Sequence, residues 1–506
     1  MEPSSRLLRV CFRLFVPCTF LLAACLLLSG VASAAPSIAL SKKSGPPTSR
    51  IKVSGSGFEP NVGVDIFFDT KDKALVVTNG KGEFHDATIH APRGAHPGEH
   101  WVTALERNND KGAQKPFLVQ TNWSQFHFDA DGTRLNPYEN VLSPKTSGNL
   151  DLKWNHSTEL WVSSAPAVVN GVVYVGSWDD NVYALYANTG KTLWSYTTGG
   201  YVASSPAVVQ GVVYVGAGYP DDSLYALEAR TGARLWSYRT GDAVFSDPAI
   251  VHGVVYVGSV DGTLYALNSR TGAKLWSYTT QGVIDYAPAV SEGNVYVGAN
   301  YPDNKLYALN ATTGKLLWSF AGGANYGMNG PSVANGVVYV GSNDHHLYAL
   351  NARTGALLWS FTTGDFVVST PAIAEGVVYF SSWDSNVYAV NARMGTKVWS
   401  YTTGGNVGSS PAFANGVVYV GSGDGNVYAL NARSGDWLWS YTTGSNNGVY
   451  SSPAVANGVV YIGSGDYNVY AFSLGQDQEQ TGLAPDFKTL RPNFELKVSK
   501  PVATPH

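Results

Sequence analysis

The fold is decided by the stretch Ser409–Gly444, SSPAFANGVVYVGSGDGNVYALNARSGDWLWSYTTG, which recurs in close copies along most of the chain. Pro411 to Ala414 is short and apolar, Asn415-Gly416 is a two-residue hairpin turn, and the VVYVGS that follows is rich in β-branched and aromatic residues. A second turn at Asp424-Gly425 leads into a third strand, and a further glycine turn leads into a fourth around Trp439. Each copy is expected to form a four-stranded antiparallel meander.

A series of prolines and a series of tryptophans, each with a period of about 40 residues, give the number of copies. The first tryptophan of one series precedes the first proline of the other, and no tryptophan follows the last proline. The strand around Trp154 is therefore expected to complete the final copy and close a ring, which leaves no open sheet edge. Four strands in each 40-residue repeat predict an all-β fold with an eight-bladed β-propeller. The prolines are Pro166, Pro206, Pro248, Pro288, Pro331, Pro371, Pro411 and Pro453, and the tryptophans are Trp154, Trp194, Trp236, Trp276, Trp318, Trp359, Trp399 and Trp439.

The length and charge bound the remaining organisation. A chain of 506 residues leaves room for a second small domain beside the propeller. Only 14% of the residues are charged and the net charge is −4, so we expect no nucleic-acid partner. The expected parts are a signal peptide (1–34), an immunoglobulin-like β-sandwich (35–120), a connector (121–153), the propeller (154–474) and an extended C-terminal tail (475–506) that lies along the propeller through Phe487, Leu490 and Phe494.

The start of the chain has the composition of a secretory leader. Arg6, Arg9 and Arg13 precede an apolar run from Leu14 to Leu28, and Ala32-Ser33-Ala34 is a small-residue cleavage site. This predicts a bacterial protein that is secreted, periplasmic or on the cell surface, with no membrane span after cleavage. An uncleaved anchor is one alternative, and lipidation at Cys25 is another. All three cysteines lie in this leader, which excludes disulfides and thiolate chemistry from the mature chain.

The segment after the leader lacks the 40-residue period. Short alternating runs such as IKVSGSGF, VDIFFDT and GEFHDATIH indicate strands of a small sandwich. Their order, with the turn residues between them, resembles bacterial immunoglobulin-like domains that are appended to cell-surface proteins.

The repeats carry a family resemblance. The pattern Ala429-x-Asn431-x-x-Ser434-Gly435-x-x-x-Trp439 is similar to the docking motif of quinoprotein dehydrogenases, which contain pyrroloquinoline quinone-like propeller repeats. The resemblance implies that the eight tryptophans pack between neighbouring blades. It also covers the connector, where Trp123, Phe126, Asn149, Leu150 and Trp154 match the entry segment of such repeat proteins. Quinoprotein enzymes need a calcium-binding set of acidic and amide residues and commonly a vicinal disulfide, and the disulfide cannot form here. The same fold family includes the scaffold lipoprotein of the outer-membrane β-barrel assembly machine, which binds no quinone.

Function is sought where the copies differ. The turns between the first and second strands and between the third and fourth are uniform, whereas the turns between the second and third strands and the links between blades vary. The variable set forms one face and supplies the candidate binding residues Trp178, Tyr219, Asp247, Asp285, Tyr301, His345, His346 and Trp383.

The charged members of this set have simpler explanations than a metal or a catalytic site. An aspartate recurs in every turn between the second and third strands, and an aspartate that caps its own turn explains it without a calcium ion. His345-His346 lacks the spaced third ligand of a zinc site. Asp247 and Asp285 stand where other copies have small residues, and near the channel mouth they could hold a cation or act on a substrate.

These observations favour a secreted, non-catalytic scaffold or binding protein. We expect a protein or glycan ligand on the variable face, no catalytic residues, no metal and no cofactor. One alternative is a dehydrogenase that uses pyrroloquinoline quinone with calcium. Another is a carbohydrate-binding or adhesion protein.

Overall fold

The computed structural model describes residues 34–323, 327–444, 447–475, 483–493 and 496. The predicted signal peptide, with its cysteines, falls almost entirely on residues 1–33, outside the described part. Within that part, the only helical segments are two single 3-10 turns, η1 (Ser147–Asn149) and η3 (Phe487–Thr489). No described helix is long and apolar enough to cross a membrane.

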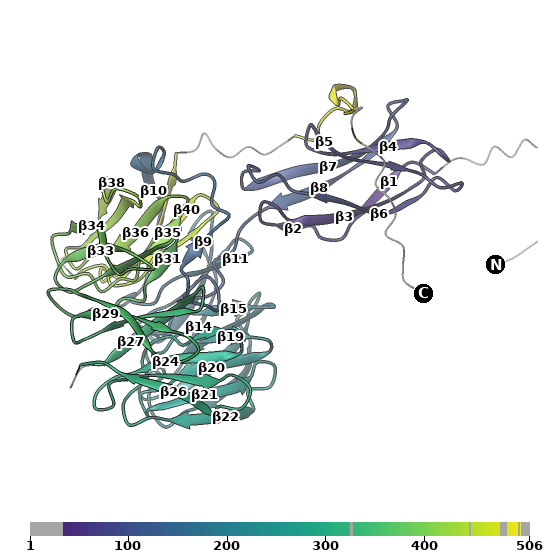
Figure 1. Cartoon of the computed structure of the whole chain (residues 1–506). Coiled ribbons are helices and arrows are strands. Elements are labelled where there is room, and N and C mark those ends of the chain that lie inside the picture. The colour runs from purple at the N-terminus through teal and green to yellow at the C-terminus, as the bar shows by residue number, and fades with distance from the viewer. Residues whose placement is uncertain (1–33, 324–326, 445–446, 476–482, 494–495, 497–506) are drawn as a thin grey trace, which may run out of the picture.

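The first described strands build a two-sheet β-sandwich (Figure 1). Ile51 and Val53 of one sheet pack with Ile66, Phe68 and Phe117 of the other in a single buried cluster. An immunoglobulin-like relationship stays a prediction. One sheet contains β1 (Ser37–Leu40), β3 (Arg50–Ser56) and β6 (Phe84–His90), and the other contains β2 (Ser44–Gly45), β8 (Gly112–Val119), β7 (Gly98–Glu106), β4 (Gly63–Phe68) and β5 (Lys71–Val77).

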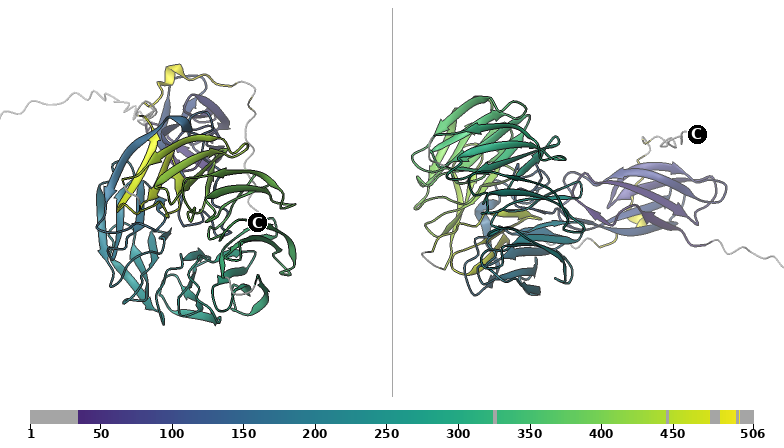
Figure 2. Two further views of the ribbon diagram at one scale, coloured as in Figure 1. Left: turned by 90° about the vertical axis from the view of Figure 1, so that its left-hand side faces the viewer. Right: turned by 90° about the horizontal axis from the view of Figure 1, so that it is seen from below.

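Eight antiparallel blades of four strands each follow in the described part of the chain, one of them extended by a short parallel strand, and they stand around a ring (Figure 2). The predicted all-β, eight-bladed propeller is confirmed. The first four blades are, in order, β11 (Ala167–Val169), β12 (Val172–Gly176), β13 (Asn181–Tyr186) and β14 (Thr192–Thr197); β15 (Ala207–Val209), β16 (Val212–Gly216), β17 (Ser223–Glu228) and β18 (Arg234–Arg239); β19 (Ala249–Val251), β20 (Val254–Gly258), β21 (Thr263–Asn268) and β22 (Lys274–Thr279); and β23 (Ala289–Ser291), β24 (Asn294–Ala299), β25 (Lys305–Asn310) and β26 (Leu316–Ala321). The next three blades are β27 (Met328–Ala334), β28 (Val337–Ser342), β29 (His346–Asn351) and β30 (Leu357–Thr362); β31 (Ala372–Ala374), β32 (Val377–Ser381), β33 (Asn386–Asn391) and β34 (Lys397–Thr402); and β35 (Ala412–Ala414), β36 (Val417–Gly421), β37 (Asn426–Asn431) and β38 (Trp437–Thr442). The eighth blade contains β39 (Ala454–Ala456), β40 (Val459–Gly463), β41 (Asn468–Leu474) and β10 (Leu150–Ser157).

The last blade closes the ring with a strand from the start of the propeller. β10 pairs antiparallel with β41, so that Leu150 lies opposite Leu474 and Trp154 lies opposite Ala471. The Trp439 indole N–H donates to the Leu150 carbonyl at 2.8 Å, and the Ser451 hydroxyl donates to the Ser164 carbonyl at 2.9 Å. Two ends of the repeat array therefore hold each other, and no edge strand remains open there.

The eight tryptophans join neighbouring blades in a repeated way. The Trp318 indole N–H donates to the Ala352 carbonyl of the next blade at 3.0 Å, and the Trp276 indole N–H donates to the Ala311 carbonyl at the same distance. The ring lies flat against a turn glycine: a Cβ on Gly355 would stand 2.6 Å from the Trp318 ring, and φ there is +70°. Glycine is required at this point because of both the close approach and the left-handed backbone.

The connector forms a belt on the inner side of the ring, which we define as residues 122–136. Backbone carbonyls of the belt accept the inner-strand N–H groups of six blades at 2.6 to 3.0 Å. A seventh blade uses the Gln125 side chain, and the eighth receives the Asn136 amide. β9 (Leu135–Asn136), the end of the belt, also pairs in parallel with β35. The six donors are Val168, Val208, Val290, Val333, Ile373 and Phe413.

Trp123 and Arg134 lie near the two ends of the belt, and both are fully buried. The guanidinium donates to the carbonyls of Pro411 at 2.7 Å, Phe126 at 2.6 Å and Pro453 at 3.1 Å. Its carbon lies 4.5 Å from the Phe126 ring centre. Arg134 thus ties the belt to the last two blades.

The described tail segment, residues 483–493, lies on the sandwich rather than along the propeller, so that prediction is wrong for this segment. Leu490 packs with Phe67 and Leu105 of the sandwich, and Phe487 borders the same cluster. The Gln114 amide donates to the Pro485 carbonyl at 2.7 Å, which fixes the segment on β8. Burial of the apolar tail residues is more favourable against the apolar side chains of β4 and β7 than against the polar turns of the propeller. The predicted contact through Phe494 lies outside the described residues.

Candidate binding face

The aspartate in each variable turn is bound by its own blade. In the first blade, Asp179 Oδ1 accepts the Asn181 N–H at 3.1 Å, and Oδ2 accepts the Tyr183 hydroxyl at 2.8 Å and the Glu159 N–H at 3.0 Å. Burial first, and the carboxylate second, raise the pKa of the Tyr183 hydroxyl. The turn therefore accounts for the repeated aspartate without an ion. The same hydroxyl-to-carboxylate bond, at 2.5 to 2.8 Å, joins Asp179–Tyr183, Asp221–Tyr225, Asp261–Tyr265, Asp303–Tyr307, Asp344–Tyr348, Asp384–Tyr388, Asp424–Tyr428 and Asp466–Tyr470.

An arc of four aromatic side chains crosses this face, and we call Trp161, Trp178, Tyr201 and Phe245 the aromatic arc. Trp178 comes from the turn between β12 and β13, and the others come from the links before β11, β15 and β19. Successive ring centres are 5.6, 4.9 and 5.3 Å apart. Trp161 and Trp178 remain 42% and 37% exposed. These contacts hold two exposed indoles in a continuous row across three blades.

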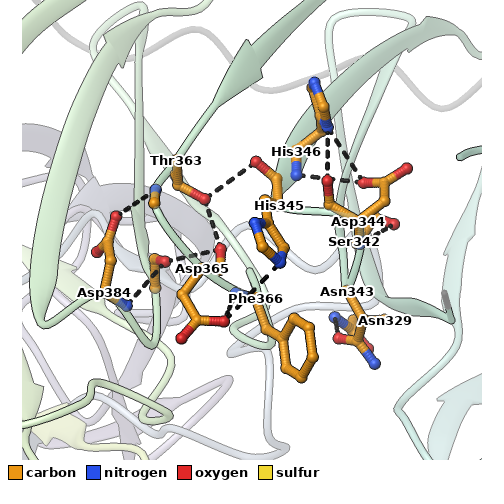
Figure 3. Close-up of polar contacts among 12 residues, drawn as sticks. Asn329, Ser342, Asn343, Asp344, His345, His346, Thr363, Asp365, Phe366 and Asp384 are labelled. Atoms are coloured by element: carbon orange, nitrogen blue, oxygen red, sulfur yellow. Dashed lines mark hydrogen bonds and ion pairs between the residues drawn. The ribbon is translucent and has the colours of Figure 1, made fainter.

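A second cluster combines His345, Phe366 and Trp383. The Phe366 ring centre lies 5.5 Å from that of His345 and 5.5 Å from that of Trp383. Figure 3 shows the polar frame around it: His345 Nε2 is 3.9 Å from Asp365 Oδ1, and the Thr363 hydroxyl donates to the carbonyls of both residues. Because the backbone bonds position His345, its ring is presented beside Phe366 at the surface.

The remaining aromatic and histidine candidates stand apart from these two groups. Tyr219 and Tyr301 project from their turns and are 71% and 67% exposed. His346 Nδ1 lies 2.9 Å from the Asp344 carbonyl oxygen, and its ring stacks on Tyr348. His346 therefore supports its own turn rather than the surface cluster.

Asp247 stands where several other blades have a serine, just before the proline that precedes the innermost strand. Its Oδ1 accepts the Ser205 N–H of the preceding blade at 2.5 Å, as the Ser452 hydroxyl accepts the Ser410 N–H at 2.9 Å. Burial raises the pKa of Asp247 to about 7, although the Ser205 hydrogen bonds and the Arg134 charge oppose the shift. This carboxyl group titrates near neutral pH.

Asp285 lies in the next blade and has a different partner. Its Oδ1 accepts the Asn300 amide at 2.6 Å, and burial raises its pKa to about 6. Asp247 is thus held by the preceding blade, whereas Asp285 is held by the turn after β24 of its own blade. Among the described residues, no group of three or more histidine, cysteine, aspartate or glutamate side chains is placed to hold a metal ion.

Belt residues and the segments that begin the innermost strands β19 and β23 enclose a small cavity. Gln125, Phe126, His127 and Asp129 line a cavity of about 10 Å³ together with Pro248, Ala249, Ala287 and Pro288. Burial, with the Arg134 charge, lowers the pKa of His127 to about 3, and its Nε2 has no hydrogen-bond partner among the described residues. The cavity has room for about one water molecule.

Sequence reasoning placed Trp178 and Trp383 on the surface but did not identify the belt. The roles of Trp123, His127 and Arg134 are not signalled by any repeat, because the belt contacts the blades mainly through its backbone carbonyls. The aromatic arc could be assembled from sequence, since its members occupy corresponding links and turns of consecutive copies.

The sequence matches a family whose description is outer membrane protein assembly factor BamB, over residues 147–249, 242–332 and 303–493. These matches span more than half of the chain. The chain belongs to this BamB family. The predicted resemblance to pyrroloquinoline quinone-like repeat proteins is thereby confirmed. No curated protein matches the sequence.

Solved structures share the fold with the BamB-family chain. BamB from Moraxella catarrhalis is 22% identical with a TM-score of 0.56, and the match covers 65% of this chain and 99% of that one. A quinohemoprotein alcohol dehydrogenase from Comamonas testosteroni is 17% identical with a TM-score of 0.62, covering 71% and 81%. A europium-containing methanol dehydrogenase is 16% identical with a TM-score of 0.62, covering 70% and 98%.

These structures correct the prediction that the protein uses no cofactor. The prediction is wrong because the solved structures that share this propeller include a quinohemoprotein alcohol dehydrogenase and a europium-containing methanol dehydrogenase. The cavity between the belt and the inner strands β19 and β23, at about 10 Å³, does not fit a three-ring quinone.

Proposed function

We propose that this protein is a binding propeller of the bacterial cell envelope that docks a polypeptide on its variable face. The observation that carries the proposal is the aromatic arc, in which Trp161 and Trp178 stay exposed while their neighbours hold them in place. Exposed tryptophan and tyrosine are the residues that most often dominate protein interfaces. Rigid rings lose little conformational entropy on binding, so the arc is suited to contact a partner.

We infer the location in the cell envelope from the family match and from the composition of the leader. The matched family is described by an outer membrane protein assembly factor. The composition of residues 1–34 supports export of the chain, as a secreted, periplasmic or surface protein. Measuring the protein in periplasmic, membrane and culture fractions, with and without residues 1–34, tests this part. Retention of the full chain in the cytoplasm would contradict it.

A peptide array tests the docking proposal. The full chain is applied to arrayed peptides of varied charge and hydropathy, and the bound protein is measured for the native chain and for Trp178→Ala. We expect binding to a subset of peptides that falls at least about tenfold in the variant, the loss typical of a central interface aromatic. Trp437→Ala is the matched control, because Trp437 is 54% exposed but opens β38 at the other end of the blade. Equal loss in both variants, or no binding to any peptide, would sink the proposal.

Two other functions each have an observation in their favour. A quinone-dependent dehydrogenase is favoured by the propeller fold that the chain shares with a quinohemoprotein alcohol dehydrogenase. Dye reduction with alcohols after addition of pyrroloquinoline quinone and calcium would support that function. A carbohydrate-binding protein is favoured by the exposed rings of Trp178 and Trp383, and glycan-array binding that is lost on Trp178→Ala plus Trp383→Ala would support it.

A further inference from the structure

The loops of the variable face carry charges of one sign. The links between blades and the turns between second and third strands contain no lysine or arginine. Nearby positive charge comes from strand ends: Arg239 lies 3.6 Å from Asp222, and Lys305 lies 2.9 Å from Asp303. The acidic residues of these loops are Glu159, Asp179, Asp180, Asp221, Asp222, Asp242, Asp247, Asp261, Asp285, Asp303, Asp344, Asp365, Asp384, Asp424 and Asp466.

The turn aspartates accept their hydrogen bonds mainly from uncharged donors. Asp179 accepts only neutral donors, namely two N–H groups and the Tyr183 hydroxyl. Burial raises the pKa of Asp247 and Asp285, which sets these two inner carboxyl groups apart from the turn aspartates, most of which are half-buried. Neutral donors stabilise an ionised carboxylate without cancelling its field. The summed field on this face is therefore negative.

Carboxylates lie directly beside the aromatic arc. The Glu159 side chain is exposed two residues before Trp161, and its backbone N–H is fixed by Asp179. Asp242 is exposed in the link that supplies Phe245. The charges of Asp242 and Asp222 add to burial in raising the pKa of Tyr201, which places both carboxylates close to that ring. The electron-rich faces of the arc thus stand among negative charges.

The opposite end of the propeller has the reverse charge. Seven of its turns between third and fourth strands each carry one exposed lysine or arginine: Lys191, Arg230, Arg270, Lys315, Arg353, Arg393 and Arg433. The sandwich is attached at that same end, where the Thr121 N–H donates to Asn457 at 2.6 Å and the Asn140 amide donates to the Ala95 carbonyl at 2.8 Å. The acidic face is left uncovered by the described part of the chain.

We propose that the aromatic arc and its flanking carboxylates bind a positively charged, extended polypeptide segment, with lysine or arginine side chains laid over the Trp161 and Trp178 rings. This inference rests on the proposed docking function and specifies its ligand. A cation over an indole face is attracted by the electron-rich ring, and surrounding carboxylates strengthen this attraction. A neutral glycan gains nothing from the charges, and an acidic glycan or peptide is repelled by them.

Fluorescence anisotropy with the full chain tests this assignment. Three labelled dodecapeptides alternate serine with arginine, glutamine or glutamate. We expect the arginine peptide to bind at least about tenfold more tightly than the glutamine peptide, the glutamate peptide not to bind, and the arginine affinity to fall steeply between 50 and 300 mM salt, as screening of exposed charges requires.

Variants locate the binding. Trp178→Ala and the pair Glu159→Gln plus Asp242→Asn should each weaken arginine-peptide binding about tenfold, the loss of about 1.4 kcal/mol. Trp437→Ala and Asp436→Asn, which change a tryptophan and an aspartate at the opposite end, should leave it unchanged. A melting curve for each variant shows that the fold is kept.

The outcomes separate the two proposals. Binding of all three peptides alike, lost on Trp178→Ala, would overturn the cationic ligand but keep the docking function. No peptide binding at all would overturn both. Self-association of the chain, seen by sedimentation and abolished by Glu159→Gln plus Asp242→Asn, would show that the face takes the basic end of a second copy, and would also overturn the assignment.

Discussion

Replacing the buried arginine of the belt should destabilise the propeller far more than replacing a surface arginine. In Arg134→Met the side chain keeps its length but loses three donations, to Pro411, Phe126 and Pro453. Each buried carbonyl left without its donor costs about 1 to 2 kcal/mol. The lost contact with the Phe126 ring adds about 1 kcal/mol, and removal of a buried charge offsets part of the total. We expect a net loss of about 3 kcal/mol.

Calorimetry or urea unfolding of the full chain measures this difference, with Arg353→Met as the control. Arg353 stands in an exposed turn between β29 and β30, so its replacement should change the free energy of unfolding by less than about 0.5 kcal/mol. An Arg134→Met protein as stable as the native chain, or more stable, would refute the view that the belt ties the last two blades together.

Three further results are expected. Trp276→Ala should lower the free energy of unfolding by about 3 to 5 kcal/mol, since it removes a large ring and its bond to the Ala311 carbonyl; an unchanged urea midpoint would contradict the blade-docking role. The pKa of Asp247 in the folded state, about 7, lies above its ordinary value of 3.8, so its contribution to stability should be lost as pH rises from about 4 to 7. Asp247→Asn should flatten that part of the stability profile, and an identical profile in the variant would show that Asp247 does not titrate there. Leu490→Asp should release residues 483–493 from the sandwich, measured as faster protease cleavage of the tail, whereas Leu483→Asp, at a residue that is 93% exposed, should leave the cleavage rate unchanged.

The repeats made the fold predictable because each local signal recurs eight times. Asn415-Gly416 and its equivalents define hairpins, and a tryptophan with the same spacing in every copy must have the same structural role. The turn aspartates could likewise be explained from one copy, since a side chain that accepts from its own turn needs no distant partner.

The belt and the tail could not be predicted, for two physical reasons. Six of the eight blades meet the belt through backbone carbonyls, which every residue carries, so most residue identities in the belt do not encode which blade each one meets. The tail has a few apolar residues, and Leu490 would match any apolar surface; only the folded sandwich shows that Phe67 and Leu105 offer one. From the sequence, Asp247 is a candidate reactive group. In the structure it accepts the backbone N–H of the preceding blade, as Ser452 does in the last blade.

Photo-cross-linking tests the central claim most directly. The arginine–serine peptide, with a benzophenone group at its centre, is irradiated on the full chain, and the attached residues are identified by mass spectrometry. We expect attachment within residues 158–166, 177–180, 198–206 and 240–248, which carry the aromatic arc and its carboxylates. Attachment to the turns at 187–191, 229–233 or 269–273 on the opposite end, or to the sandwich, would contradict it.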